Sequence, residues 1–168
     1  MSIWWSLHLP REAASVALAR RLLLGTMETA GVDPEISYDL SVALSEACAN
    51  AVEHGGGDGT GGDYRVTAFI DGDTCRIEVT DSGPGFARRS STVRRESRTR
   101  GERRPPGAPR QQHPHGPAPA QAEHGRGLFL IEALTDHVRY RDRPGRGGVV
   151  VSFDKILKWR EGALLKAS

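Results

Sequence analysis

The chain has 168 residues and a formal net charge of +2, which suits one ordinary domain with a core of its own. Its two cysteines, Cys48 and Cys75, show none of the paired spacings of zinc sites or disulfide frameworks, so a reducing compartment is expected. No stretch reaches the apolar length of a membrane span, and residues 2–9 are too short and polar for a signal peptide. These observations predict a cytoplasmic protein without a membrane partner.

The N-terminal third predicts one strand followed by two helices. Residues Ile3–Leu9 alternate in polarity and include adjacent tryptophans, as is typical of an extended edge. Residues Arg11–Ala30 are rich in alanine, leucine and arginine, with apolar residues near one face. Asp33 and Pro34 then form an N-cap and first-turn pair, and apolar residues recur at helical spacing until Gly55.

The remainder of the chain predicts two hairpins separated by a helix. Two β-like runs, Tyr64–Ile70 and Thr74–Thr80, flank an Asp-Gly turn and should pair antiparallel. A helix is predicted from about Gly127 to Asp136, followed by strands at Val138–Arg141 and Gly148–Phe153 with a Pro-Gly turn between them. A short helical tail is predicted at the C-terminus.

Positive charge is concentrated in the segment Ala87–Glu123. Its nine arginines and three glutamates give a local balance of +6, which leaves −4 for the rest of the chain. Proline, serine and glycine fill the segment, and Val93 is almost its only core-forming residue, so a disordered insertion is predicted. A nucleic-acid arm is the alternative, but the segment lacks interleaved aromatics. The histidines in or beside this tract, His113, His115 and His124, have no rigid geometry for a metal.

The predicted order of elements is β-α-α-β-β-α-β-β. Because strands joined by hairpins dominate, this order excludes a doubly wound parallel sheet. It predicts an α+β fold, in which helices cover one face of a mixed, mostly antiparallel sheet in a two-layer α/β sandwich.

Two motifs carry polar groups suited to a nucleotide. In SEACANAVEHG, Glu46 and Asn50 lie four residues apart on one helix face, where one can handle a proton and the other can hold a metal. In VTDSGPGF, Asp81 ends a strand and, when ionised, only accepts hydrogen bonds, which suits an adenine amine. Gly83 and Gly85 follow it and let the backbone approach a ligand closely.

A third motif, HGRGLFLI, brings Gly125 and Gly127 just before the apolar run Leu128–Leu134. The free amides of a helix N-terminus there could meet phosphates. Each motif alone has a plainer explanation, since Glu46 and Asn50 suit a solvated helix face and Asp81 suits a turn. The order and spacing of all three favour a ligand site.

Two neighbouring features are given no chemistry. His54 continues the line of Glu46 and Asn50, but a helix-end histidine that interacts with the dipole explains it. The glycine-rich run Gly55–Gly62 is a connection, because no Lys-Ser or Lys-Thr pair follows it as in a phosphate loop.

These motifs, in this order, resemble the GHKL ATP-binding superfamily, and within it most closely the small anti-sigma-factor serine kinases of bacteria. The resemblance covers nearly the whole chain except Ala87–Glu123, which occupies the place of the ATP lid. It implies a sandwich of the GHKL (Bergerat) type with a long lid insertion, as a single domain over residues 1–168.

The resemblance also implies roles for individual residues, with ATP and Mg²⁺ as the cofactors. Glu46 would be the general base, and Asn50 would ligate the Mg²⁺ that bridges the phosphates. Asp81 would accept from the adenine amine, while Gly83 and Gly85 close around the base. The helix whose amides face the phosphates would begin with Gly125, Arg126, Gly127 and Leu128.

The function implied is an ATP-dependent protein serine kinase and anti-sigma factor. It would phosphorylate a small anti-anti-sigma protein of the STAS type, sequester a sigma factor and form a homodimer, and nucleic acid is not an expected partner. One of the adjacent tryptophans, Trp4 or Trp5, must face away from the core and could lie at a subunit contact.

Two departures from the family pattern motivate an alternative function. The lid segment is long, and the last strand carries Gly147, Gly148, Val149 and Val150 where these kinases usually have a threonine near the adenine. Loss of one such hydrogen bond would weaken binding by roughly 1 kcal/mol. The alternative is a catalytically weak or inactive nucleotide-binding module that acts as an anti-sigma or antagonist-binding protein and still holds its protein partner. The catalytic half of a sensor histidine kinase is disfavoured, because no preceding helix carries a phosphoacceptor histidine and His8 lies on a strand-like segment.

Overall fold

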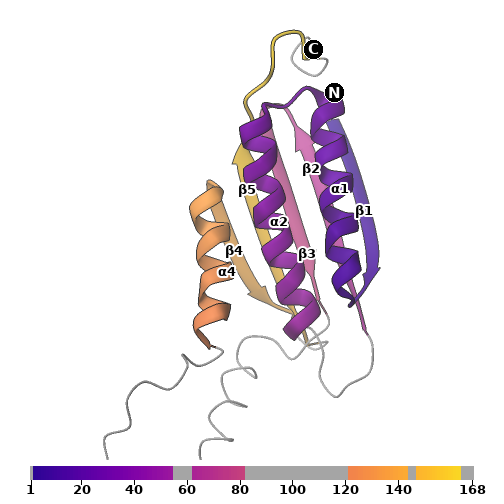
Figure 1. Cartoon of the computed structure of the whole chain (residues 1–168), viewed down its shortest axis with the longest axis vertical. Helices are drawn as coiled ribbons and strands as arrows, with labels where there is room; N and C mark the ends of the chain where they lie inside the picture. Colours follow the sequence, from indigo (N-terminus) through magenta and orange to yellow (C-terminus); the bar gives the residue numbers. More distant parts are fainter. Residues whose placement is uncertain (1, 55–61, 82–120, 144–146, 164–168) are drawn as a thin grey trace, which may run out of the picture.

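The computed structural model describes residues 2–54, 62–81, 121–143 and 147–163. Within these ranges, five strands form one sheet and three helices lie against it (Figure 1). The strands are β1 (Ser2–Pro10), β2 (Asp63–Asp71), β3 (Thr74–Thr80), β4 (His137–Asp142) and β5 (Val149–Ile156), and the helices are α1 (Ala13–Ala30), α2 (Pro34–His54) and α4 (Gln121–Leu134).

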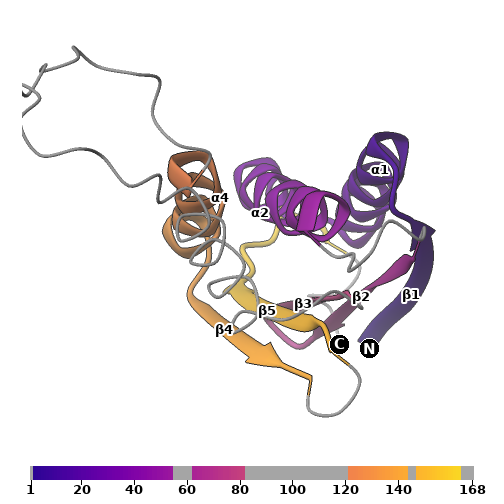
Figure 2. The ribbon, with the colours of Figure 1, turned by 90° about the horizontal axis from the view of Figure 1, so that it is seen from below.

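The sheet has the strand order β1-β2-β3-β5-β4, and every one of these pairings is antiparallel. The predicted mostly antiparallel sheet is therefore confirmed, and no parallel pair occurs among the described strands. The predicted Asp-Gly turn joins β2 to β3, with Gly72 at a φ of 54°, in the left-handed region that glycine adopts readily. Figure 2 shows the helices in one layer and the sheet in the other, as predicted for the two-layer sandwich.

Local signals in the sequence determine where α1 and α2 meet. Gly31 ends α1 with a φ of 85°, and its amide donates to the carbonyls of Met27 and Glu28 at 3.1 Å. Asp33 precedes α2, and its Oδ1 accepts from the amide of Glu35 at 2.9 Å. A short turn thus reverses the chain between two helices that lie side by side on the sheet (Figure 1).

The hydrophobic core lies between the two layers. Alternate residues of each inner strand face the helices, as the burial of Tyr64, Val66, Ala68 and Ile70 in β2 shows. Apolar residues at helical spacing pack against these strand residues from the helix layer. In α1 and α2 these fully buried residues include Leu23, Met27, Leu40 and Leu44.

A chain of buried hydroxyl groups ties α1 to β2. The Oγ of Ser15 donates to the carbonyl of Glu12 at 2.7 Å and lies 2.7 Å from the Oη of Tyr64. Either hydroxyl can be the donor in the bond between Ser15 and Tyr64. Both side chains are buried, so this bond fixes the start of α1 over the sheet.

The two adjacent tryptophans face opposite sides of the sheet. Trp5 lies on the helix side, where its indole Nε1 donates to Thr26 of α1 at 3.1 Å. Trp4 lies on the other side and is 65% exposed. The expectation that one of the pair faces away from the core is confirmed.

Two predicted boundaries are wrong. Helix α4 begins at Gln121, six residues before the predicted start at Gly127, and therefore includes the last residues of the predicted lid segment. The described tail 157–163 is not helical, and instead Trp159 forms an isolated antiparallel bridge with Val32. The glycine-rich connection, the Pro-Gly turn and lid residues 87–120 lie outside the described residues, apart from Gly62. None of the helices described is long and apolar enough to cross a membrane.

Burial of weakly acidic side chains predicts a loss of stability in alkali. Burial raises the pKa of the Cys48 thiol and of the Cys75 thiol from 9.0 to about 12. In the unfolded chain both thiols ionise from about pH 9, while the folded protein keeps them protonated. The free energy of unfolding is therefore unaffected by these groups below about pH 9 and falls as the pH rises toward 12.

Urea unfolding of the wild type and of the double variant Cys48→Ala/Cys75→Ala, followed by circular dichroism from about pH 8 to about pH 11, measures this effect. The double variant should be less stable at pH 8 but should lose less stability over the same interval. Equal losses for the two proteins would show that the thiols do not contribute.

Candidate functional site

Four chain segments meet at one end of the molecule. The C-terminal half of α2, the end of β3, the N-terminal half of α4 and the start of β5 all lie at the end opposite the N-terminus (Figure 1). This arrangement follows from the topology, because α2 and β3 run toward this end while α4 and β5 start from it. All three motifs have described residues at this end.

Glu46 and Asn50 lie one turn apart on α2, both half-buried, and they face α4. Gly127 of α4 packs directly against them. A Cβ atom added to Gly127 would lie 2.9 Å from the Oε2 of Glu46 and 3.6 Å from each terminal atom of the Asn50 carboxamide. Only glycine fits without displacement, because real Cβ atoms essentially never come within 3.0 Å of another heavy atom. Two of the three motifs are thus in direct contact.

The carboxamide of Asn50 has hydrogen-bonding capacity that the described residues do not use. Its Nδ2 atom is buried and has no partner among the described residues. A buried polar atom without a partner costs about 1–3 kcal/mol, so the carboxamide of Asn50 is a candidate for contact with a water, an ion or a ligand. Since the two ends of a carboxamide can exchange by rotation, the same position can present an oxygen. That oxygen fits the preference of Mg²⁺ for hard ligands.

Asp81 comes directly after β3 and is 6% exposed. Its amide donates to the carbonyl of Val149, and its Oδ1 accepts from the amide of Val149, both at 3.0 Å. These two bonds extend the pairing of β3 with β5 by one residue and fix the direction of the carboxylate. Gly83 and Gly85, which follow in the same motif, lie outside the described residues.

The glycine motif of α4 is placed differently from the prediction. Gly125, Arg126, Gly127 and Leu128 lie beyond the first turn of α4, so they are not the residues whose amides a helix leaves free. Arg126 is exposed, Gly127 is buried against α2, and Leu128 packs against the core. The prediction of free amides at these positions is therefore wrong for this conformation.

A lysine that the sequence analysis missed holds the far end of α4. The Nζ of Lys155 in β5 donates to the carbonyl of Leu134 at 2.7 Å and lies 3.2 Å from the Oδ2 of Asp39 in α2. Its side chain is only 13% exposed, so the ion pair is shielded from solvent. No short-range sequence pattern could reveal this contact, since Asp39, Leu134 and Lys155 lie far apart in the sequence.

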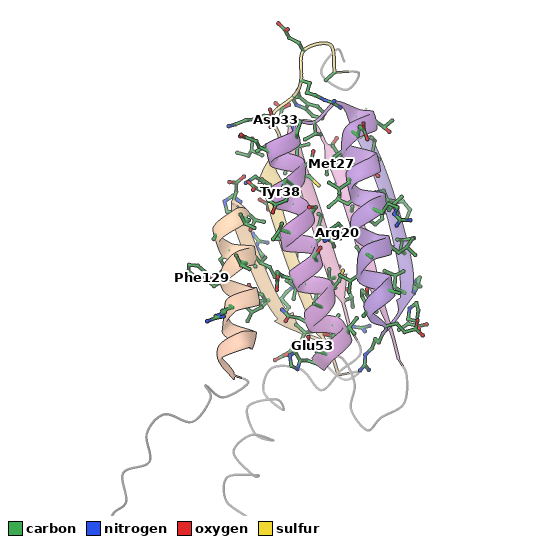
Figure 3. All side chains as sticks on the ribbon, in the orientation of Figure 1. Arg20, Met27, Asp33, Tyr38, Glu53 and Phe129 are labelled. Carbon is green, nitrogen blue, oxygen red and sulfur yellow. The ribbon has the colours of Figure 1, made fainter. Side chains whose placement is uncertain are left out.

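His54, one turn beyond Asn50 on α2, contacts the neighbouring Glu53. The Nε2 of His54 lies 3.5 Å from the Oε2 of Glu53. Glu53 lies at the C-terminal end of α2, on the exposed side (Figure 3). The interaction of His54 with the helix dipole stays a prediction.

Comparisons with known proteins identify the family. A model of the histidine kinase-like ATPase domain matches residues 9–155. The chain belongs to this family. It is 32% identical to the serine-protein kinase RsbW of Oceanobacillus iheyensis over 155 residues. The alignment covers 92% of this chain and 87% of that protein. RsbW of Bacillus subtilis is 27% identical over 157 residues, with 90% and 84% covered.

A solved structure supports the fold. The crystal structure of the RsbU and RsbW domains of a Mycobacterium tuberculosis protein aligns with a TM-score of 0.57 and 22% identity, over 91% of this chain. The chain spans 32% of that protein's solved chain. The α+β sandwich predicted from the sequence is therefore the architecture that this family adopts.

The contact of Gly127 with Glu46 predicts a variant in which stability and activity separate. In Gly127→Ala the new methyl group displaces the Glu46 carboxylate, which is the mobile end of its side chain and can move at little cost. Alanine also favours helix by about 1 kcal/mol over glycine. We expect an unchanged or slightly higher melting temperature, together with phosphotransfer reduced about tenfold or more.

The matched control is Gly25→Ala in α1, where an added Cβ meets nothing within 4 Å. It should gain a similar helix stabilisation and keep full phosphotransfer. Wild-type activity in Gly127→Ala would show that the position of the Glu46 carboxylate does not matter.

Proposed function

We propose that the protein is an ATP-dependent protein serine kinase that acts as an anti-sigma factor in the cytoplasm. In this proposal it phosphorylates a serine of a small STAS-type anti-anti-sigma protein and sequesters a sigma factor when that antagonist is absent. The observation that carries the proposal is the packing of Gly127 against both Glu46 and Asn50, since it joins a proton acceptor, a metal-ligand candidate and the glycine motif. The similarity to serine-protein kinases named RsbW over nine-tenths of the chain supports it.

Each side chain has a distinct task in the proposed reaction. The Glu46 carboxylate accepts the proton of the substrate serine hydroxyl as that oxygen attacks the γ-phosphorus of ATP, and the bond from this phosphorus to the β–γ bridging oxygen breaks, so that ADP leaves. The Asn50 carboxamide would hold Mg²⁺ through its oxygen, and bound Mg²⁺ would neutralise charge on the phosphates. The Asp81 carboxylate, fixed by Val149, accepts from the adenine amine. The chain is proposed to be one domain, with Gly83 and Gly85 around the base and Ala87–Glu123 as the lid.

A homodimer is proposed as the working assembly. The strand β1 is an edge of the sheet and carries no Asp, Glu, Lys or Arg, the charges that commonly protect such edges. Beside it lies an apolar groove of about 570 Å³ lined by Ile3, Leu18 and Leu22, among others. Light scattering that showed only monomer at micromolar concentration would contradict this assembly.

Replacement of Glu46 by glutamine tests the proposed base. Glu46→Gln keeps the shape of the side chain but removes its capacity to accept a proton. Transfer of labelled γ-phosphate to an anti-anti-sigma protein should fall about 100-fold or more, while calorimetry should show ATP binding close to wild type. The matched control is Glu53→Gln at the exposed end of α2, which should transfer normally. Normal transfer by Glu46→Gln would remove this residue from the reaction.

A binding module without kinase activity is the second candidate. It is favoured by the position of Gly125 to Leu128 inside α4, where their amides are not free for phosphates. It is also favoured by the glycines at 147 and 148, which hold positive φ values of 68° and 104° where the related kinases usually have a threonine nearby.

A magnesium-dependent ATP titration of the wild type, Asn50→Ala and Asp81→Asn distinguishes the two candidates. The kinase should bind ATP tightly, Asn50→Ala should lose the dependence on magnesium, and Asp81→Asn should bind more weakly. A module would bind ATP weakly or not at all and still hold its protein partner. Identical behaviour of all three proteins would contradict the proposed site.

A further inference from the structure

The sheet has a second face, which no described helix covers (Figure 2). The strand register determines which residues share each row across it. One row contains Trp4, Phe69, Arg76, Asp154 and His137, in that order from β1 to β4. The next row contains Ser6, Thr67, Glu78, Ser152 and Arg139. An aromatic pair therefore lies at one side of this open face and a group of charges at the other.

The charged side forms a hollow of about 260 Å³ over β3, β5 and β4. Its two carboxylates are recessed, with Asp154 20% and Glu78 35% exposed, while Arg76 and Arg141 project outward at 60% and 67%. Asp154 interacts with Arg76 at 4.0 Å and with His137 at 2.7 Å, and Glu78 interacts with Arg141 at 3.9 Å. Both carboxylates are thus already paired.

Arg139 is the arginine of the hollow that is not paired with either carboxylate. It lies in the middle of β4, lines the hollow and is exposed, and among the described residues it makes no hydrogen bond or ion pair. Ser152 faces it across the strand pair and offers a hydroxyl donor. A guanidinium beside a hydroxyl is suited to bind one oxyanion, because both groups donate toward the same point.

We propose that the open face of the sheet is a docking surface for an acidic segment of a protein partner, with one carboxylate on Arg139 and an apolar residue on Trp4 and Phe69. Those aromatics are cross-strand neighbours and are 65% and 40% exposed. Exposed aromatic and arginine side chains are the residue types that dominate binding energy at protein interfaces. Phe69 and Arg139 lie three strand spacings apart across the sheet and two residues apart along the strands, or about 16 Å in all, which about five extended residues can span.

Charge excludes the other occupants of this face. The chain's own segment Ala87–Glu123 has a balance of +6, the same sign as Arg139. A nucleic acid needs a track of unpaired cations for successive phosphates, whereas the described residues of this face hold two, Arg139 on β4 and Arg65 on β2, three strand spacings apart. A peptide segment with one carboxylate for Arg139 and an apolar residue for Trp4 and Phe69 matches this face best.

Nuclear magnetic resonance of the labelled full chain tests the proposal. The probe is a ten-residue peptide with a leucine and a glutamate five residues apart, titrated at low ionic strength, where surface charges are least screened. Its addition should shift the amide signals of Arg139, Ser152 and Phe69. In Arg139→Glu, the dissociation constant should rise about fivefold to tenfold. ATP binding should be unchanged in that variant, since Arg139 is remote from the candidate site.

Two controls make the result decisive. Arg20→Glu changes the net charge equally on an exposed position of α1 in the helix layer (Figure 3) and should bind the peptide within about twofold of wild type. A peptide with glutamine in place of glutamate should bind no better to the wild type than to Arg139→Glu. Equal weakening by both charge reversals, or no shift on the sheet, would overturn the proposal. A single-stranded DNA of ten nucleotides that shifted the same signals more strongly would also overturn it.

Discussion

The contact between α4 and α2 at Gly127 is the constraint on which the site depends. An ordinary side chain at this position would press on the Glu46 carboxylate, so the two helices could not approach as closely with the same arrangement. The approach buries one end of the Asn50 carboxamide, and it brings the glycine motif to the two polar residues of α2. Glycine inside a helix usually lowers its stability, and at position 127 it is needed because a Cβ atom would clash with the Glu46 carboxylate.

The two-layer fold could be predicted because its signals are local. Asp33 and Pro34 mark a helix start, Gly31 marks a helix end, and Asp-Gly marks the β2–β3 turn. Each of these residues acts on its own neighbours within a few positions, so the sequence alone reveals it. The alternation of buried and exposed residues in β2 likewise follows from the pleat of a single strand.

The parts that were not predicted depend on contacts between distant segments. Glycines at positions 125 and 127 suggest a helix boundary, yet α4 continues through them because α2 lies against Gly127. The tail after β5 is held by Val32 and Trp159, not by its own helix propensity. That Arg139 has no partner among the described residues can be seen only when β3, β5 and β4 are aligned in register.

The tether at Lys155 has a consequence for how the molecule can move. It fastens the last carbonyl of α4 to Asp39, at the end of the helix remote from Glu46. Fourteen residues of helix make a stiff rod of about 21 Å, held at its C-terminal end and packed against α2 through Gly127 at its middle. A displacement of the C-terminal end would tilt the helix and change how Gly127 lies against Glu46 and Asn50 of α2. The contact between Lys155 and Asp39 is thereby mechanically coupled, through α4, to Glu46 and Asn50.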